Sequence, residues 1–326
     1  MKRFTGVMMV AALAAGLVAG CKPSTETAKS PEGAAKPKVV LGVSLLTMAN
    51  PFFKDMADSM QQEAKKYGYE VIVTAGEMDP SRQKDQVGDF IVKKVNAIIL
   101  APCDSKSIGT SIQEANKAGI PVFTADIACL DKNAKVVTHV ATDNYSGGKL
   151  AGEAMVKLLG GKGKVAIIDH PEVESVILRT KGFREVVSKS PGIQIVAQLP
   201  GGGARDVSFK TAQDILEKNP DLQGIFAIND PSALGAVAAL EKAGRKGKVK
   251  VVGFDGQPEA KQAVKDGKID ADAIQFPDKI GVGVVDAVSR YLAGEKVPAQ
   301  SLIPTALYTK AEADKDPKLA GGAPKA

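Results

Sequence analysis

Five polar side chains of this chain lie at the edges of apolar stretches, where a strand would end. Asp126 closes PVFTAD, Asn229 closes GIFAIN, Asp255 closes VVGFD, Gln275 follows ADAI, and Arg179 begins RTKGF. Each alone can be explained as a cap or turn residue, or, for Arg179, as half of a surface ion pair. Together they are the partners that a hydroxyl-rich neutral ligand needs, because each buried hydroxyl must exchange its water for a fixed hydrogen-bond partner.

Two adjacent aromatic residues follow a capping signal near the start of the chain. Asn50 is placed to cap a helix whose first residue is Pro51, and Phe52 and Phe53 come next. Neighbours on a helix do not share a face, so one ring should point away from the core. An aromatic face at the carboxyl end of a parallel strand is a suitable platform for a sugar ring.

The elements that must position these residues alternate regularly between apolar strands and amphipathic helices. This spacing predicts the α/β class, with parallel sheets covered by helices on both faces. Open sheets of this kind bind ligands outside the carboxyl ends of their strands. The predicted strands are Val39–Ser44, Glu70–Thr74, Ala97–Leu100, Pro121–Thr124, Val136–Val140, Lys164–Ile168, Ile193–Gln198, Gly224–Ala227 and Lys250–Gly253.

The amino terminus has the order of a lipoprotein signal. Lys2 and Arg3 precede an apolar stretch, which ends in the lipobox Leu-Val-Ala-Gly-Cys at Cys21. The stretch is too short to span a bilayer, so residues 1–20 are predicted to be a signal peptide, with lipid attached at Cys21. Residues 21–37 contain no aromatic or branched apolar side chain and are predicted to be a flexible tether. We expect a protein in the periplasm or on the cell surface, anchored to either membrane of a cell that has two.

Composition and motifs argue against several classes of protein. The formal charge is +6, but the lysines are scattered and not interleaved with aromatics, which argues against nucleic-acid binding. The chain has no GxSxG, HExxH or GxxxxGK[ST] motif, so an enzyme is not expected and neither is a cofactor. His139 and His170 are the only histidines, and their spacing does not resemble a metal site.

Two cysteines remain after the lipidated one. Cys103 and Cys129 follow successive predicted strands, so their loops should be neighbours at one end of a sheet. An oxidising compartment permits a disulfide between them. Two buried free thiols acting as small apolar residues are the alternative.

From about residue 38 to 311, the chain resembles the type I periplasmic sugar-binding proteins of ABC transporters. Its pattern is similar to the D-ribose-binding branch, which shares its fold with the ligand-sensing half of LacI-type repressors. NPFF, FAIND, VVGFDG and PDKIG occur in the family's order and spacing. The resemblance implies two similar lobes joined by a three-segment hinge, with ligand in the cleft between them. The implied parts are an N-terminal lobe of residues 38–142 plus 277–304, a C-terminal lobe of residues 143–276 plus 305–311, and a flexible tail of residues 312–326. The ligand contacts carried over are Asn50, Phe52, Phe53, Asp126, Arg179, Asn229, Asp255 and Gln275.

The resemblance also implies partners and a specificity. The implied function is capture of a monosaccharide by a monomer, which delivers it to an ABC permease with its ATPase. Alternatives are a polyol or nucleoside ligand, or a chemoreceptor or sensor kinase as partner. A repressor is not expected, because a lipobox stands where a DNA-binding segment would be. This chain departs from the ribose pattern at Ala101, Ile127 and Gly203, where that pattern has asparagine, arginine and an aromatic residue. Ala101 and Ile127 make this corner of the site more apolar, which favours a deoxy sugar, another pentose or hexose epimer, or a ligand with an apolar substituent.

Overall fold

The computed structural model describes residues 38–319. The predicted signal peptide, lipidated Cys21 and tether lie outside the described residues, as do residues 320–326 of the predicted tail. Within the described range, no helix combines the length and the apolar character needed to cross a membrane.

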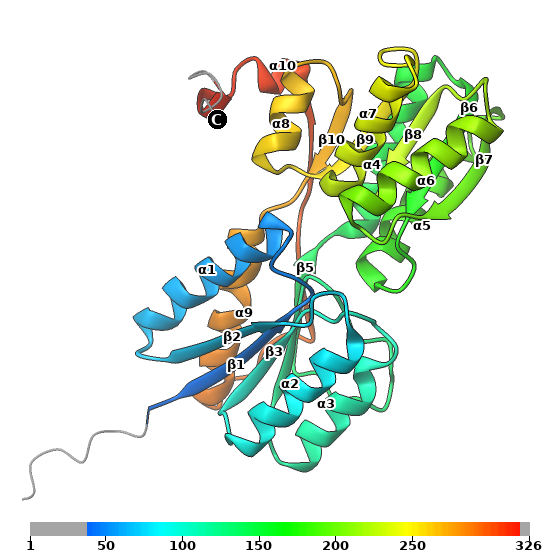
Figure 1. The fold of residues 1–326 in the computed structure, drawn as a ribbon. Helices are drawn as coiled ribbons and strands as arrows, with labels where there is room; N and C mark the ends of the chain where they lie inside the picture. The colour runs from blue at the N-terminus through cyan, green and yellow to red at the C-terminus, as the bar shows by residue number, and fades with distance from the viewer. Residues whose placement is uncertain (1–37, 320–326) are drawn as a thin grey trace, which may run out of the picture. The chain divides into compact units, whose positions relative to one another are not determined.

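Two six-stranded sheets form the centre of the described chain (Figure 1). In the first sheet the order is β11-β5-β4-β3-β1-β2 and every pairing is parallel. Helices α1 and α9 pack together on one face of it, and α2 and α3 lie on the other. This sheet and these helices are called the first lobe. Its elements are β1 (Val40–Leu45), α1 (Pro51–Lys66), β2 (Glu70–Ala75), α2 (Pro80–Val92), β3 (Ala97–Leu100), α3 (Ile108–Lys117), β4 (Val122–Ala125), β5 (His139–Thr142), α9 (Pro277–Leu292) and β11 (Gln300–Ile303).

The second sheet has the order β12-β10-β9-β8-β6-β7, in which only β12 pairs antiparallel. Helix α4 packs against α5, and α6 packs against α7. This sheet and its helices are called the second lobe. Its elements are α4 (Asn144–Leu159), β6 (Lys162–Asp169), α5 (Glu174–Val187), β7 (Gly192–Pro200), α6 (Arg205–Lys218), β8 (Gly224–Ala227), α7 (Asp230–Lys242), β9 (Lys250–Asp255), α8 (Pro258–Lys265), β10 (Ala271–Ile274), β12 (Ala306–Thr309) and α10 (Lys310–Ala313), followed by the short 3-10 helix η1 (Pro317–Leu319).

The chain passes between the two sheets at three places: after β5, after β10 and after β11. The central strands are apolar and buried, as expected for parallel strands with helices on both faces. In β1, for example, Leu41, Val43 and Leu45 are fully buried. The predicted α/β class with two parallel-dominated sheets is therefore confirmed.

Close packing of α4 on α5 depends on two glycines. A Cβ on Gly148 would overlap the carbonyl oxygen of Arg179, and a Cβ on Gly182 would overlap that of Tyr145. The residue after Gly182, Phe183, stacks its ring on that of Phe226 with centroids 4.4 Å apart. The glycines therefore let α5 approach closely enough to fix where Arg179 stands.

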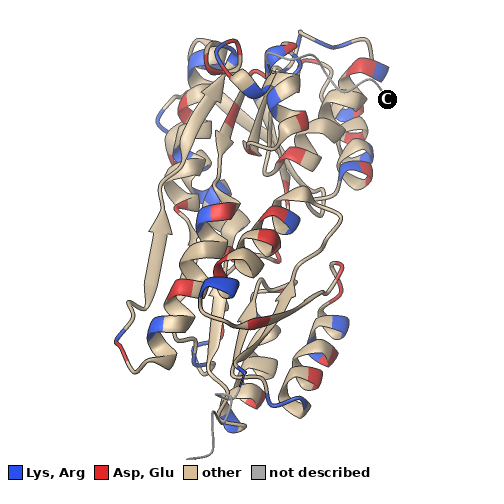
Figure 2. Ribbon diagram, turned by 90° about the vertical axis from the view of Figure 1, so that its left-hand side faces the viewer, with Lys and Arg blue, Asp and Glu red and all other residues tan. Residues whose placement is uncertain are grey.

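Charged residues of both signs are interspersed along the helices of both lobes (Figure 2). Most ion pairs join exposed side chains, such as Lys54 with Asp58 on α1 and Arg205 with Glu259 in the second lobe. Such pairs contribute little to stability, because water screens them. The ion pair between Arg179 and Asp255 is buried, and it lies in the cavity described below.

Of the two alternatives for the cysteines, the described chain has free thiols at Cys103 and Cys129 and no disulfide between them. The thiol of Cys103 is buried and points to the carbonyl oxygen of Leu46, whereas that of Cys129 points to the backbone of Asp131. The two sulfurs thus point to different neighbours although their loops follow adjacent strands.

The tail predicted to be flexible from residue 312 is folded as far as residue 319. Its residues complete α10 and form η1. The Tyr308 hydroxyl donates to Asp316 at 2.9 Å, and Lys265 Nζ donates to the carbonyl oxygen of Leu319 at 2.7 Å. The segment is rich in Lys, Pro and Gly, a composition typical of a flexible tail. The contacts that fold it are made to β12 and α8, and local composition does not reveal them.

Candidate ligand-binding cleft

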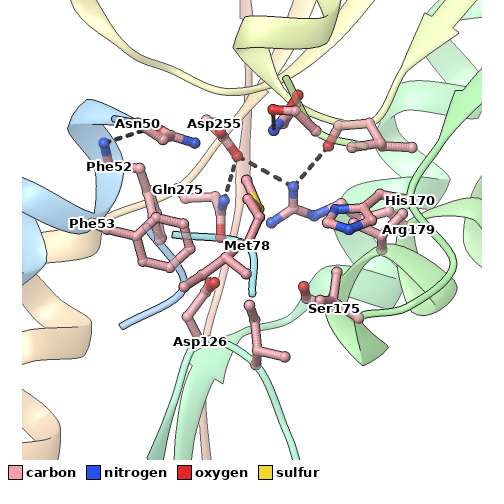
Figure 3. A pocket seen from close by; sticks show the side chains of 17 residues that line it. Asn50, Phe52, Phe53, Met78, Asp126, His170, Ser175, Arg179, Asp255 and Gln275 are labelled. Atoms are coloured by element: carbon pink, nitrogen blue, oxygen red, sulfur yellow. Dashed lines mark hydrogen bonds and ion pairs between the residues drawn. The ribbon is translucent and has the colours of Figure 1, made fainter. Parts of the chain in front are cut away.

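One cavity gathers all eight predicted ligand-contact residues at the carboxyl ends of the strands (Figure 3). The space between its lining atoms is about 390 Å³ when open solvent is included, and the cavity volume that water can occupy is about 30 Å³. Both lobes line it, with Asn50, Phe52, Phe53 and Asp126 on the first lobe and Arg179, Asn229 and Asp255 on the second. Gln275 lies where the chain crosses from β10 to α9. That these residues touch a ligand stays a prediction.

Phe52 and Phe53 form the apolar wall of the cavity. They are 3% and 4% exposed, and their rings meet edge to face with centroids 5.2 Å apart. Both rings line the cavity and both also belong to the buried core of the first lobe.

Asn50 caps α1 and also reaches the second lobe. Its Oδ1 accepts a hydrogen bond from the Phe52 N–H at 2.9 Å, which confirms the predicted cap. The same atom accepts a hydrogen bond from Gln257 Nε2 at 2.6 Å. A residue that can be explained as a cap is thus also a link between the lobes.

Arg179 is the central cation of the site. It lies in the second turn of α5, not at the start of a helix as the sequence suggested. It is 4% exposed, and its Nη1 lies 3.2 Å from Asp255 Oδ1. Nη1 also donates to the carbonyl oxygen of Ile228 at 2.7 Å, and Nε donates to Asn144 Oδ1 at 2.8 Å. The guanidinium therefore has partners that fix its plane.

Aromatic packing adds to this arrangement, because the Arg179 guanidinium stacks over the ring of Phe254, 3.9 Å from its centroid. A desolvated cation over an aromatic face is held by the ring quadrupole. Since Phe254 precedes Asp255 on β9, one strand end contacts the arginine through both residues.

Asp255 collects several donors. Besides Arg179, its Oδ1 accepts from Gln275 Nε2 at 2.6 Å, and its Oδ2 accepts from Gln257 Nε2 at 3.2 Å. Burial raises the pKa of this carboxyl, and the arginine and these hydrogen bonds oppose that rise. The site thus holds a carboxylate that is already oriented before a ligand arrives.

Asp126 is different because one of its oxygens lacks a partner. The residue follows β4 in the left-handed region at φ 63° and is 3% exposed. Among residues 38–319, nothing donates a hydrogen bond to Asp126 Oδ1, and Gln275 Oε1 is unpaired in the same way. Burial raises the pKa of Asp126 to about 7, although Arg179 lowers it in part. Two unpaired acceptors in one cavity are suited to hydroxyl donors of a ligand.

Asn229 is largely committed to its own lobe. Its Oδ1 caps α7 through the Ser232 N–H at 3.0 Å, and its Nδ2 donates to the carbonyl oxygen of Gly203 at 3.0 Å. Gly203 has φ 64°, and a Cβ there would lie 3.2 Å from both the Asn229 Nδ2 and the His170 Nδ1. His170 therefore fills the space beside this glycine, and burial lowers the pKa of its imidazole, so the ring is neutral at pH 7.

Other lining residues were missed from the sequence. They come from the start of α5, from the loop before it and from the loops after β1, β2 and β8, and they are Leu46, Met78, His170, Val173, Ser175, Val176 and Ile228. The RTKGF pattern places the start of this helix near Arg179, whereas α5 begins at Glu174. An earlier helix start would have brought Ser175 and Val176 into the predicted site. Of the three departures from the ribose pattern, Ile127 and Gly203 line the cavity, while Ala101 is not among its lining residues.

No cluster of three or more His, Cys, Asp or Glu side chains that could hold a metal ion occurs in the part of the chain that the structure describes.

Comparison with known proteins places the chain in a family. Residues 41–296 match the family described as periplasmic binding protein domain. The ribose import binding protein RbsB of Salmonella typhimurium is 37% identical over 277 residues, which cover 85% of this chain and 92% of that protein.

Two solved structures have the same fold. A periplasmic solute-binding protein of an ABC transporter from Actinobacillus succinogenes, with bound D-allose, superposes with a TM-score of 0.79 at 31% identity, covering 86% of this chain and all of that one. A solute-binding protein from Bacillus halodurans with bound myo-inositol gives 0.80 at 30% identity, covering 87% and 98%. A solute-binding component, not an enzyme, is what these matches indicate. With its two lobes, its cavity and these matches, the chain belongs to the periplasmic binding protein domain family.

Proposed function

We propose that this protein is an extracytoplasmic receptor that captures a monosaccharide between its lobes and delivers it to an ABC importer. The observation that carries the proposal is the composition of one cavity. It combines two buried aromatic rings, Phe52 and Phe53, with two buried acceptors that lack donors, Asp126 Oδ1 and Gln275 Oε1. A sugar ring presents an apolar face and several hydroxyl donors, and it fits both halves of this surface.

The ligands of the relatives support this class and set its range. The Salmonella typhimurium relative is named for ribose, and the two solved structures hold D-allose and myo-inositol. All three are small and hydroxyl-rich. The myo-inositol complex favours a cyclic polyol as the second candidate ligand.

The cavity wall argues for a ligand that is not ribose bound through the same contacts. Ile127 stands beside Asp126, and Met78, Val173 and Val176 line the cavity too. An apolar wall gives no partner to a hydroxyl, and leaving a buried hydroxyl unpaired costs about 1–3 kcal/mol. A deoxy sugar, or an epimer that turns its hydroxyls elsewhere, avoids this cost.

Binding is proposed to favour one arrangement of the lobes. Next to the cavity, Ser105 of the first lobe donates its N–H to the Glu172 carbonyl oxygen at 3.0 Å, and its Oγ accepts from the Glu174 N–H at 2.9 Å. A ligand that touches both lobes binds best when they are in contact, so it shifts the population toward that arrangement. The permease would then distinguish liganded protein by the surface that both lobes form.

The anchor and the location are part of the proposal. Lipid on Cys21 would hold the protein to a membrane while residues 21–37 let the receptor move. Labelling cells with radioactive palmitate tests this, because the wild-type chain should carry label and a Cys21→Ser variant should not. Label on both chains, or on neither, would contradict lipidation at this residue.

A ligand screen tests the function. The chain from residue 21, carrying Cys21→Ser, is unfolded and refolded to remove any bound solute, and its melting temperature is measured with pentoses, hexoses, deoxy sugars, polyols and nucleosides. A ligand at 100 times its Kd adds about 2.7 kcal/mol, a shift of several degrees. Stabilisation by one monosaccharide supports the proposal, and stabilisation by myo-inositol alone supports the second candidate. No stabilisation by any compound would contradict both.

A further inference from the structure

The turn that follows β9 has an unusual backbone. Asp255 has φ 128° and Gly256 has φ 81°, so two successive residues lie at positive φ. An aspartate rarely adopts such a conformation, and it persists only where surrounding contacts hold it. What holds this turn therefore decides where the Asp255 carboxylate points.

Two buried carboxyl groups hold the turn. The Gly256 N–H donates to Asp272 Oδ2 at 3.1 Å, and the Gln257 N–H donates to Asp230 Oδ2 at 2.6 Å. Asp272 comes from the middle of β10, and Asp230 is the first residue of α7. Both side chains are fully buried, and neither lines the cavity.

The remaining oxygens of the two carboxyl groups lie beside the same residue of β9. Asp230 Oδ1 and Asp272 Oδ1 have no donor within residues 38–319. A Cβ on Gly253 would lie 3.4 Å from the first and 3.2 Å from the second, so both unpaired oxygens border one small space. Two buried carboxylates so close together cannot both stay ionised without water, whereas one shared proton allows a hydrogen bond between them.

Other charged groups near the pair do not replace that proton. Asp255 adds a further negative charge, and its own partner is Arg179. Lys261 on α8 lowers the pKa of Asp272, but by less than burial and the other neighbours change it. The Tyr308 hydroxyl of β12 donates to Asp316 and not to this pair. The single charge that a proton-sharing pair keeps lies at the N-terminus of α7, where the helix dipole stabilises an anion.

We propose that Asp230 and Asp272 share one proton, and that this acid pair positions the turn that carries Asp255 and Gln257. Through this turn the pair acts on Asp255, a predicted ligand contact, and on Gln257, which donates to Asn50 of the first lobe. The link to ligand binding rests on the proposed function, but the shared proton and the held turn do not.

The pH range follows from the same groups. Burial raises the pKa of Asp272 to about 7 and raises that of Asp230 well above its ordinary value. Asp272 therefore ionises as pH rises through about 7, while Asp230 keeps the proton that the pair then shares. Exposed aspartates are ionised well below that pH.

NMR spectroscopy of the unliganded chain from residue 21, with Cys21→Ser, tests the proposal without any ligand. At pH 8 the carbon-13 shifts of the Asp230 and Asp272 carboxyl groups should together report one bound proton, although exposed aspartates are ionised there. The amide resonances of Gly256 and Gln257 should shift as Asp272 ionises near pH 7. Two fully ionised carboxyl groups at pH 8 would overturn the proposal.

Two substitutions separate positioning from general stability. Asp272→Asn keeps an acceptor for Gly256 and replaces the shared proton by an amide N–H, so the two turn amides should keep their shifts and lose their pH dependence. Asp272→Ala should accelerate hydrogen exchange at Gly256 and Gln257 at least tenfold. Asp270→Asn is the matched control, because Asp270 pairs with Lys250 at the start of the same strand, and it should leave the titration unchanged. Titration that persists in Asp272→Asn would overturn the assignment.

Discussion

Breaking the buried ion pair of the site gives the largest effect expected from a single substitution. In Arg179→Met, Asp255 loses its cation while it remains buried, and Asn144 Oδ1 and the Ile228 carbonyl oxygen lose a donor. Removing one partner of a buried ion pair costs about 3–5 kcal/mol, because an uncompensated charge is left behind. We expect the free energy of unfolding at pH 7 to fall by about that amount.

A second substitution isolates the cause. Adding Asp255→Asn to Arg179→Met removes the uncompensated charge, so the double variant should be more stable than Arg179→Met alone. It should still not bind ligand, since both charged groups are gone. Stability that falls further in the double variant would contradict this explanation.

Urea unfolding followed by circular dichroism measures the free energy of unfolding of the single and the double variant. The slope of the transition checks that the unfolded state is unchanged. Arg205→Met is the matched control, because Arg205 pairs with Glu259 in solvent and such pairs contribute about 0–1 kcal/mol. If Arg179→Met costs no more than Arg205→Met, then the guanidinium does not hold the site together and the reasoning fails.

Three further predictions concern packing, pH and the thiols. Gly148→Ala should destabilise the protein by about 1–3 kcal/mol in thermal unfolding, because its Cβ would overlap the backbone of α5. Gly88→Ala on α2 should stabilise the protein by about 0.5–1 kcal/mol, because a Cβ there meets no neighbour. Equal effects of the two substitutions would contradict the packing argument. The folded state holds a proton on Asp126 that the unfolded state releases above about pH 4, so the free energy of unfolding of the unliganded protein should fall as pH rises from 4 to 7. Asp126→Asn should reduce this dependence on pH. An unchanged dependence in urea titrations at several pH values would refute the prediction. Alkylation of unfolded Cys21→Ser protein without reductant should label both Cys103 and Cys129 in the intact mass, and an unlabelled pair would show a disulfide after all.

The sequence by itself determined the class of fold and the place of the site. Apolar strands that alternate with amphipathic helices can bury their side chains only as parallel sheets between helices. The carboxyl ends of parallel strands meet at one edge, so Asp126 and Asp255 had to lie at such an edge once their strands were known. The capping role of Asn50 was readable for a similar reason, since a cap depends only on residues next to it in the chain.

Only the tertiary structure decided which partners these residues take. The sequence offers several acids for Arg179, and the close approach of α5 to α4 and β9 selects Asp255. The lack of a donor at Asp126, and the shared surroundings of Asp230 and Asp272 beside Gly253, follow from elements distant in the chain. Contacts of this kind depend on how loops from separate strands are placed, which local residue patterns do not encode. The site is therefore located by the order of the strands, and its electrostatics are set by their packing.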